Sequence, residues 1–472
     1  MGGIAGVWYL DGRPTTREIA GRLEEAVRHR GPDAGGSWAG EEVALAQRLL
    51  WTTPQSLSEH GPHASTEGRV VLCADLRIDN RGELLDACGV RGPERAAIGD
   101  VELLLMAYTL WGSRCPERLI GDFAFAVWDA RRELLFCARD HVGVKPFFYH
   151  HAPGRVFAFA SESKGVLAVH EVPRRLNEAR LIDYIERSFD DKTATFYADI
   201  LRLPPGHSLT VTRDGVRTSP YWSLDPTKEL RLGAKEYAPA FRELFVEAVR
   251  CRLRSAFPVG GMLSGGLDSS SIVCVARNLA AAEEPKIPLH SFSAVFDETP
   301  ECDERPYIET VTAVGGLQSH FIRADQVGPM DDLDRILWEQ DEPFFAPNLF
   351  MHRALYAAAR TAGVRVLLDG FDGDTAVSHG AKYLTELGAG GRWLTLGWEI
   401  AWLAWRSGRS PSSLVRKHVL SPLTPARIRR YVRGARPRRA PGRAPHPILD
   451  RSFAERAGWS DRMGARAPTA RV

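Results

Sequence analysis

The 472-residue sequence lacks several features that mark specialised classes of protein. It contains no run of 18 apolar residues, which argues against a membrane-spanning helix. It has no basic segment before its first apolar stretch, so it shows no signal peptide. Its seven cysteines include no Cys-x-x-Cys pair. Buried free thiols in a cytoplasmic protein therefore fit better than disulfides or a zinc site.

The charge balance is nearly neutral, with 61 Lys and Arg residues against 59 Asp and Glu residues, and 44% of residues are hydrophobic. Such a chain is globular, and its length predicts two or three domains. However, 17 basic and only 3 acidic residues lie between Trp405 and Val472. This segment is either a solvated tail or a basic segment that binds an acidic peptide or partner. It carries no nucleic-acid-binding motif, so no nucleic-acid partner is expected. Because the chain has no long apolar run, no membrane partner is expected either.

The first half of the chain has the pattern of a sheet-rich domain. Two helices are expected at 16–29 and 101–111, where apolar residues recur every three or four positions. Short apolar or alternating runs predict strands at 4–10, 42–50, 70–78, 123–128, 134–138, 147–150 and 156–160. Few crossover helices intervene, which favours an α+β domain, and a polar linker is expected between Pro204 and Gly233.

From Tyr237 onward, strands and helices alternate, which predicts βαβ units and a parallel sheet. Ligands of such sheets bind beyond the carboxyl ends of the strands. Strands are expected at 258–263, 289–296, 319–323 and 364–368, and helices at 237–253, 269–280, 306–314 and 349–362.

A loop rich in glycine and serine follows the first of these strands, Leu263-Ser-Gly-Gly-Leu-Asp-Ser-Ser-Ser271. Its glycines permit close backbone approach to an anion, and the following helix adds the positive end of its dipole. Ser264, Ser269 and Ser270 contribute hydroxyl donors. Because the lysine of a Walker A loop is absent, the loop predicts a phosphate site of another kind.

Carboxylates beside this loop predict a magnesium ion. Asp268 would repel a phosphate unless a cation intervened, and Mg²⁺ accepts one or two carboxylates together with phosphate oxygens. A second acidic segment, Asp369-Gly-Phe-Asp-Gly-Asp374, follows another strand. We therefore expect Asp268 and Asp374 to share the metal.

The loop Ser264-Gly-Gly-Leu-Asp-Ser-Ser resembles the signature of the N-type ATP pyrophosphatases, and the chain as far as about His379 resembles the asparagine synthetase family. The segments that carry the wider resemblance are Met1-Gly-Gly-Ile-Ala-Gly, Arg28-His-Arg-Gly-Pro-Asp33, Gly121-Asp-Phe-Ala-Phe-Ala-Val-Trp-Asp, Arg139-Asp-His-Val-Gly-Val-Lys-Pro, Ala160-Ser-Glu-Ser-Lys-Gly-Val-Leu and Leu203-Pro-Pro-Gly-His.

This resemblance implies an α+β domain of the N-terminal nucleophile (Ntn) hydrolase type, a sandwich at 1–215 like type 2 glutamine amidotransferases. An α/β ATP-pyrophosphatase domain with a parallel sheet is expected at 237–430, and a basic Arg/Pro/Ala-rich tail at 431–472. The cofactors implied are ATP and Mg²⁺. The nucleotide-binding residues implied are Leu263, Ser264, Gly265, Gly266, Leu267, Asp268, Ser269, Ser270, Ala294, Asp369 and Gly370, with Ala294 against adenine.

The sequence departs from the family at its glutaminase site. The nucleophilic cysteine after the initiator methionine is replaced by Gly2, so glutamine hydrolysis is not expected. Arg48 and Asp100 match the family's glutamine contacts, but we interpret them as structural residues. Asp75-Leu76 replaces the Asn-Gly of the oxyanion hole, which removes a donor and adds a negative charge.

Loss of the ammonia source implies that the amine belongs to the substrate, as in β-lactam synthetases and in the macrolactam cyclases of lasso peptides. Phe371 stands where asparagine and β-lactam synthetases have Glu or Tyr, which favours the lasso branch. The partners implied are a precursor peptide, a leader peptidase and a leader-recognition protein.

Two alternatives stay open: an ammonia-dependent asparagine or β-lactam-type synthetase, and a truncated chain that binds ATP without turnover. The second rests on the family's R-x-P-F-x-D segment and following lysine, for which no match occurs. No general base is assigned, although Asp372 and His379 lie nearby in the sequence.

Overall fold

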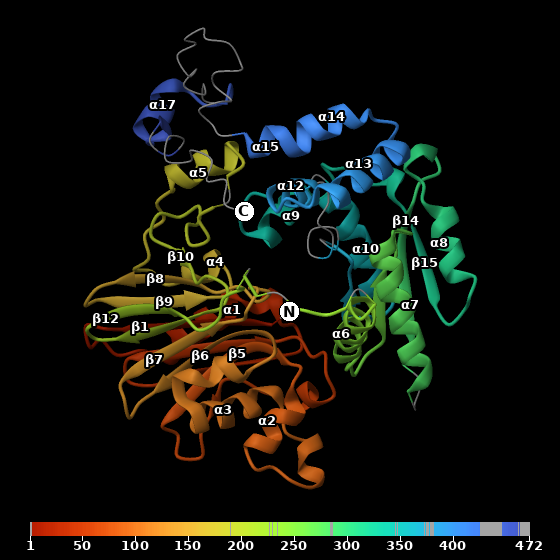
Figure 1. Ribbon diagram of the computed structural model, residues 1–472. Helices are drawn as coiled ribbons and strands as arrows, with labels where there is room; N and C mark the ends of the chain where they lie inside the picture. Colours follow the sequence, from red (N-terminus) through yellow and green to blue (C-terminus); the bar gives the residue numbers. More distant parts are fainter. Residues whose placement is uncertain are drawn as a thin grey trace. The chain divides into compact units, whose positions relative to one another are not determined.

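The structure, a computed structural model, divides into two compact units, Met1–Asp369 and Gly370–Val472. Each unit is described by itself (Figure 1). The described residues are 2–188, 190–225, 227–228, 230–233, 235–283, 287–344, 346, 348–371, 373, 377, 382–424, 446–460 and 462.

Two six-stranded sheets form the first half of unit 1. The first has the order β10-β8-β9-β1-β3-β2 and the second β12-β11-β7-β6-β5-β4, and their strand pairs are antiparallel. The strands are β1 (Gly3–Tyr9), β2 (Ala34–Ala39), β3 (Val43–Leu49), β4 (His63–Ala64), β5 (Val70–Ile78), β6 (Gly121–Asp129), β7 (Leu134–Arg139), β8 (Phe148–Ala152), β9 (Val156–Ala160), β10 (Leu201–Arg202), β11 (His207–Thr212) and β12 (Gly215–Pro220).

Three apolar layers hold this sandwich together. Side chains of both sheets, among them Trp8, Cys73 and Phe159, form the central layer. The outer face of the first sheet packs against α1 (Arg17–Ala26) and α4 (Ser163–Val166), and that of the second against α2 (Arg81–Ala87) and α3 (Asp100–Trp111). The resulting order of helices, sheet, sheet and helices is visible in Figure 1 and confirms the predicted sandwich.

The sequence prediction missed several elements of this half. The predicted linker between Pro204 and Gly233 is wrong in its first part, because β11 and β12 pair as a hairpin there. The hairpin ends at Pro220. Strand β2 and α5 (Glu178–Ile185) were not anticipated either.

The second half of unit 1 contains a four-stranded parallel sheet with the order β15-β14-β13-β16. Its strands are β13 (Val259–Met262), β14 (Leu289–Val295), β15 (Gln318–Arg323) and β16 (Val366–Leu368). The helices around it are α6 (Tyr237–Arg252), α7 (Leu267–Ala282), α8 (Arg305–Thr312), α9 (Leu333–Gln340) and α10 (Leu349–Thr361). All except α9 fall where the sequence predicted strands and helices.

Glycines in β13 let side chains pack closely on both faces of this sheet. A Cβ at Gly261 would lie 2.6 Å from Cγ2 of Val273 in α7, and one at Gly260 would lie 2.8 Å from the Phe292 ring. On one face, residues of α6 and α7 form a cluster with Val259. On the other, Leu355 and Ala359 of α10 pack with Phe292. These helices therefore hold β13 between its two neighbours.

Unit 2 is helical over its described residues. Helices α12 (Lys382–Ala389), α13 (Trp393–Ser407) and α14 (Pro411–Val415) share an apolar cluster with a π-helix at Arg416–Leu420. Two shorter helices are α15 (Ser421–Leu423) and α17 (Arg451–Arg456).

The seven cysteines are free thiols, as expected, but only Cys73, Cys115 and Cys137 are buried. The other four are half-buried or, in the case of Cys302, exposed. Across the described residues, no helix combines the length and apolarity needed to cross a membrane.

Candidate active site

The parallel sheet brings the predicted nucleotide-binding residues to one edge. Since β13 pairs in parallel with both β14 and β16, their carboxyl ends lie side by side. Leu263 extends β13 by donating its N–H to the Phe292 carbonyl of β14 at 2.9 Å. Ala294 is near the end of β14, and Asp369 and Gly370 follow β16 directly. The segment 263–270, Ala294 and Asp369 therefore share the edge at which such sheets bind ligands.

The loop between β13 and α7 is held by its own serine hydroxyls. Ser269 Oγ accepts the Ser264 N–H at 3.2 Å and donates to the Gly266 carbonyl at 3.3 Å. The hydroxyl oxygens of Ser264 and Ser269 lie 3.0 Å apart. Ser269 is buried and Ser264 exposed, so one hydroxyl braces the loop while the other faces solvent.

The geometry of this loop fits a phosphate chain. Gly265 has a φ of 84°, and a Cβ there would lie 2.8 Å from Cβ of Tyr307. No side chain among the described residues caps the N-terminus of α7. The first N–H groups of a helix lack intrahelical acceptors, so those of Leu267 and Asp268 are available to an anion. Leu267 is 87% exposed, which leaves the approach open.

The metal prediction is only partly covered by the structure. Asp268 lies in the first turn of α7 and is half-buried. Asp374, Asp372 and His379 lie outside the described residues, so the proposed metal pair and the two neighbouring candidates stay predictions. Within the described ranges, no cluster of three or more His, Cys, Asp or Glu side chains could hold a metal ion. One carboxylate with phosphate oxygens still matches how Mg²⁺ binds beside nucleotides.

A cavity of about 560 Å³ begins at this edge of the sheet. Its walls include Leu368 and Asp369 as well as Gly2 and Asp75. Burial, followed by the negative charge of Asp369, raises the pKa of Tyr356 in α10. Asp369 of the sheet edge and Gly2 of the predicted glutaminase position therefore line the same open cavity.

The position of the missing nucleophile is filled by charged groups. The Gly2 N–H donates to Asp75 Oδ1 at 3.1 Å, and Lys145 Nζ lies 2.8 Å from the same oxygen. The Arg30 guanidinium is 3.7 Å from Asp75 Oδ2. Although burial opposes ionisation, these cations outweigh it and lower the pKa of Asp75. The negative charge that Asp75 introduces is therefore neutralised within the protein.

Arg48 and Asp100, which match the family's glutamine contacts, have partners inside the chain. Arg48 donates to the Gly31 carbonyl at 2.9 Å and to Glu24 at 3.1 Å. Asp100 accepts the Ile78 N–H at 3.0 Å and pairs with Arg81 and with Arg254, the latter at 2.9 Å. Arg254 follows α6, so Asp100 ties the sandwich to the segment that begins the parallel sheet.

Glu162 links the Gly2 pocket, formed by Gly2, Arg30, Asp75 and Lys145, to α9. It accepts from His29 at 2.8 Å and from Arg30 at 2.7 Å, and it pairs with Lys164 at 2.9 Å. Lys164 Nζ also donates to the Trp338 carbonyl at 2.6 Å and lies 4.1 Å from that indole ring. Residue-by-residue reasoning missed Arg30, Lys145, Glu162 and Lys164, yet all four lie in the quoted family segments.

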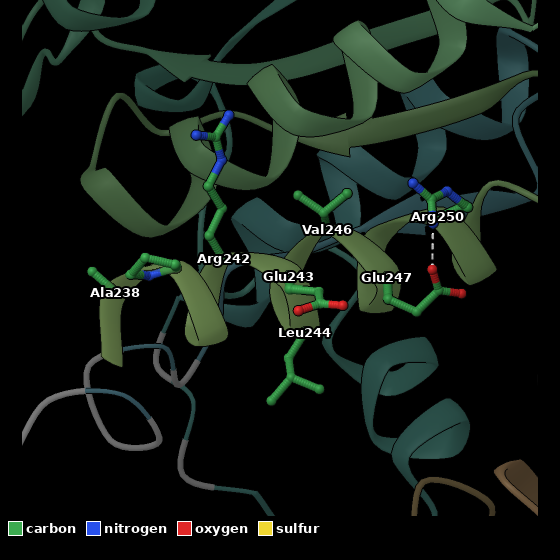
Figure 2. Close-up of a pocket in the computed structure, with 8 residues that line it drawn as sticks. Ala238, Arg242, Glu243, Leu244, Val246, Glu247 and Arg250 are labelled. Atoms are coloured by element: carbon green, nitrogen blue, oxygen red, sulfur yellow. Dashed lines mark hydrogen bonds and ion pairs between the residues drawn. The ribbon is translucent and has the colours of Figure 1, made fainter. Parts of the chain in front are cut away.

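Another hollow, of about 800 Å³, lies along α6 and contains none of the predicted residues. Figure 2 shows that α6 alone supplies its labelled side chains, including the ion pair of Glu247 and Arg250. A surface lined by one helix does not converge polar groups on a ligand, so the sheet edge remains the candidate site.

Comparison with known proteins identifies both halves of the chain. Residues 1–222 match the model of a glutamine amidotransferase domain, and residues 240–461 match that of asparagine synthase. A putative glutamine-hydrolyzing asparagine synthetase 2 of Methanocaldococcus jannaschii is 30% identical over 406 residues, which cover 82% of this chain and 76% of that protein. The chain belongs to the asparagine synthetase family.

Other family members are considerably longer. Glutamine-hydrolyzing asparagine synthetase 3 of Bacillus subtilis is 30% identical over 70% of this chain, but the match covers only 55% of that protein. Amidase chyE of Penicillium rubens is 29% identical, with coverages of 76% and 55%. The chain thus spans little more than half the length of these two relatives. The solved structure of a B. subtilis glutamine PRPP amidotransferase aligns with 81% of this chain and 93% of its own chain. The TM-score is 0.35 and the identity 12%, which is too low to support a conclusion about this protein.

The Glu162 cluster generates a prediction about pH. Burial raises the pKa of Glu162. The hydrogen bond from His29 and the interactions with Arg30 and Lys164 lower it by more, so that the pKa is about 2, below its ordinary 4.5. The stabilisation is complete above pH 4.5 and is lost as the pH falls towards 2, so Glu162→Gln should remove about 3 kcal/mol at pH 7.

Urea unfolding of both proteins between pH 7 and pH 3 measures this effect. The difference between wild type and Glu162→Gln should shrink as the pH falls below 4.5. Glu25→Gln, at an exposed pair with Arg28, is the control and should change stability by less than about 1 kcal/mol. A difference that is independent of pH would contradict the assignment.

Proposed function

We propose that this protein is an ATP-dependent amide ligase that activates a carboxylate of its substrate by adenylation and takes the amine from the substrate as well. The most specific form of the proposal is closure of a macrolactam ring in a lasso precursor peptide. The proposal of carboxylate activation rests on the Gly265 loop. Its backbone N–H groups at the α7 N-terminus lie at the same sheet edge as Asp369.

In this proposal the residues of the loop bind and orient the nucleotide. Ser264, Gly265 and the N–H groups of Leu267 and Asp268 face the phosphate chain, while buried Ser269 keeps the loop in place. Asp268 would hold Mg²⁺, which neutralises the departing charge. ATP bound there would supply an adenylyl group and leave as pyrophosphate and, after amine attack, AMP.

The residues around Gly2 support an amine that belongs to the substrate. No thiol follows Met1, and a Cβ at Gly2 would lie 2.8 Å from the Arg48 carbonyl oxygen and 3.2 Å from Asp75 Oδ1. Asp75 and Lys145 form an ion pair beside Gly2, where a glutamine amide would react. An amine on the same molecule as the activated carboxylate makes the second step effectively unimolecular, which lowers its barrier.

The choice of a peptide substrate rests on resemblance to the lasso branch around Phe371. A phenylalanine cannot accept a proton, unlike the Glu or Tyr of asparagine and β-lactam synthetases. A leader peptidase and a leader-recognition protein would then act with this enzyme.

The alternative is an asparagine synthetase that uses free ammonia. It is favoured by the names of the relatives and by the open cavity whose lining includes both Gly2 and Asp369 and which has room for a small nucleophile. A β-lactam-type synthetase and a chain that binds ATP without turnover are the remaining alternatives.

Pyrophosphate release tests the proposal directly. With ATP and Mg²⁺, a leader-free peptide that carries a free N-terminal amine and an internal Asp or Glu should stimulate release. Mass spectrometry should find the product lighter by one water. Aspartate with ammonium chloride is the parallel assay, and release in that assay alone would replace macrolactam closure by asparagine synthesis.

The loop assignment predicts a selective effect of Gly265→Ala. Gly265 has a positive φ that strains an alanine, and the added Cβ would lie 2.8 Å from Cβ of Tyr307. The loop backbone and its N–H donors would therefore shift, so the KM for ATP should rise by about tenfold or more. Gly363→Ala is the matched control, because Gly363 has a φ of 74° and no neighbouring atom within 4 Å of the added carbon. If both variants change the KM equally, the loop does not bind the nucleotide.

A third experiment separates a missing nucleophile from a closed pocket. Gly2→Cys should not produce glutamine hydrolysis, because its side chain would meet the Arg48 carbonyl oxygen and the Asp75 carboxylate. Glutamate formation from glutamine is the measurement, with binding of ATP as the check that the variant is folded. Hydrolysis by Gly2→Cys would show that only the thiol is lacking.

A further inference from the structure

Helix α13 in unit 2 has two apolar faces, of which only one is used for packing. Leu396 and Ile400 are buried in a cluster with Leu384, Leu387 and Leu414 from α12 and α14. The opposite face carries Leu394, Trp398, Trp402 and Trp405, at the spacing that places side chains on one side of a helix. We call these four residues the tryptophan ridge.

The ridge is unusually exposed for its composition. The exposed fractions are 94% for Leu394, 73% for Trp398, 45% for Trp402 and 83% for Trp405. Large exposed apolar patches on a protein mark interaction surfaces, whereas single exposed residues need no explanation. Because these side chains are largely exposed, the ridge presents a convex apolar surface.

Positive charges border the ridge. Arg392, Arg406 and Arg409 are exposed at its two ends, and the Arg406 guanidinium lies 5.2 Å from the Trp402 ring centroid. From Lys382 to Thr424, Lys and Arg outnumber Asp and Glu by six to two. The charge complement of this surface is therefore anionic.

We propose that, contrary to the expectation from the sequence of no membrane partner, the tryptophan ridge is a peripheral docking site for an anionic phospholipid surface. Tryptophan rings prefer the level of the lipid headgroups, and leucine reaches the start of the acyl chains. Arginines beside such a face attract acidic headgroups. Because the other face of α13 is fixed in the helical cluster, the ridge would be presented on a folded body. This inference is independent of the reaction proposed above.

Co-sedimentation of the full chain with vesicles tests the docking site. The protein should sediment with vesicles of phosphatidylglycerol and phosphatidylcholine, and about tenfold more weakly with phosphatidylcholine alone. Trp398→Ala with Trp405→Ala should reduce the apparent affinity for the anionic vesicles by about tenfold or more. Arg406→Gln with Arg409→Gln should reduce the preference for anionic lipid and its sensitivity to salt.

The matched control is Leu244→Ala with Val314→Ala, which removes apolar side chains that are 70% and 69% exposed outside α13. This variant should bind vesicles as the wild type does. Absence of sedimentation with anionic vesicles would overturn the proposal, and so would binding that survives loss of both tryptophans. If the wild type binds no vesicles and is a dimer that the tryptophan variant cannot form, the ridge contacts a second copy of the chain instead. If the wild type binds an acidic peptide that the tryptophan variant does not bind, the ridge is a peptide site. Circular dichroism of each variant verifies folding.

Discussion

Strand β13 is the element on which the candidate nucleotide site depends. It pairs with β14 on one side and β16 on the other, so the Ser264 loop and Asp369 emerge at the same edge of the sheet. Gly260 and Gly261 allow the Phe292 ring and α7 to press on its two faces, where any larger residue would collide. Packing behind the loop thereby fixes the direction of the α7 N-terminus at the candidate nucleotide site.

The Gly2 pocket shows how an unfavourable charge can be retained inside a fold. A buried carboxylate at Asp75 would be costly alone, but Lys145 and Arg30 supply positive charge on either side of it. Arg30 then continues the network to Glu162, and Lys164 extends it to Trp338. The charged groups around Gly2 therefore connect the sandwich to α9 within unit 1. This arrangement is consistent with a sandwich domain that contributes structure while the chemistry is proposed at the sheet edge.

Sequence reasoning succeeded where a pattern was local and strong. The alternating runs of β5 and β9 and the periodic helices α1 and α10 fell close to their predicted positions. It failed for β2, because a segment with Gly35 and Gly36 has no strand propensity and is held by pairing with β3. It also failed for the hairpin of β11 and β12, where prolines and polar residues suggested a linker and where pairing with β7 decides the outcome.

The sequence by itself determined the glycine- and serine-rich loop between β13 and α7, the absence of a thiol after Met1 and the family to which the chain belongs, because each depends on residues that are adjacent or on their identity alone. Only the tertiary structure decided that Asp75 is neutralised, since Lys145 is 70 positions away along the chain. The same holds for Asp100, whose partner Arg254 is 154 positions away, and for the ridge on α13, whose exposure depends on what packs around it. Periodicity identifies an apolar face, but burial is a property of the assembled fold.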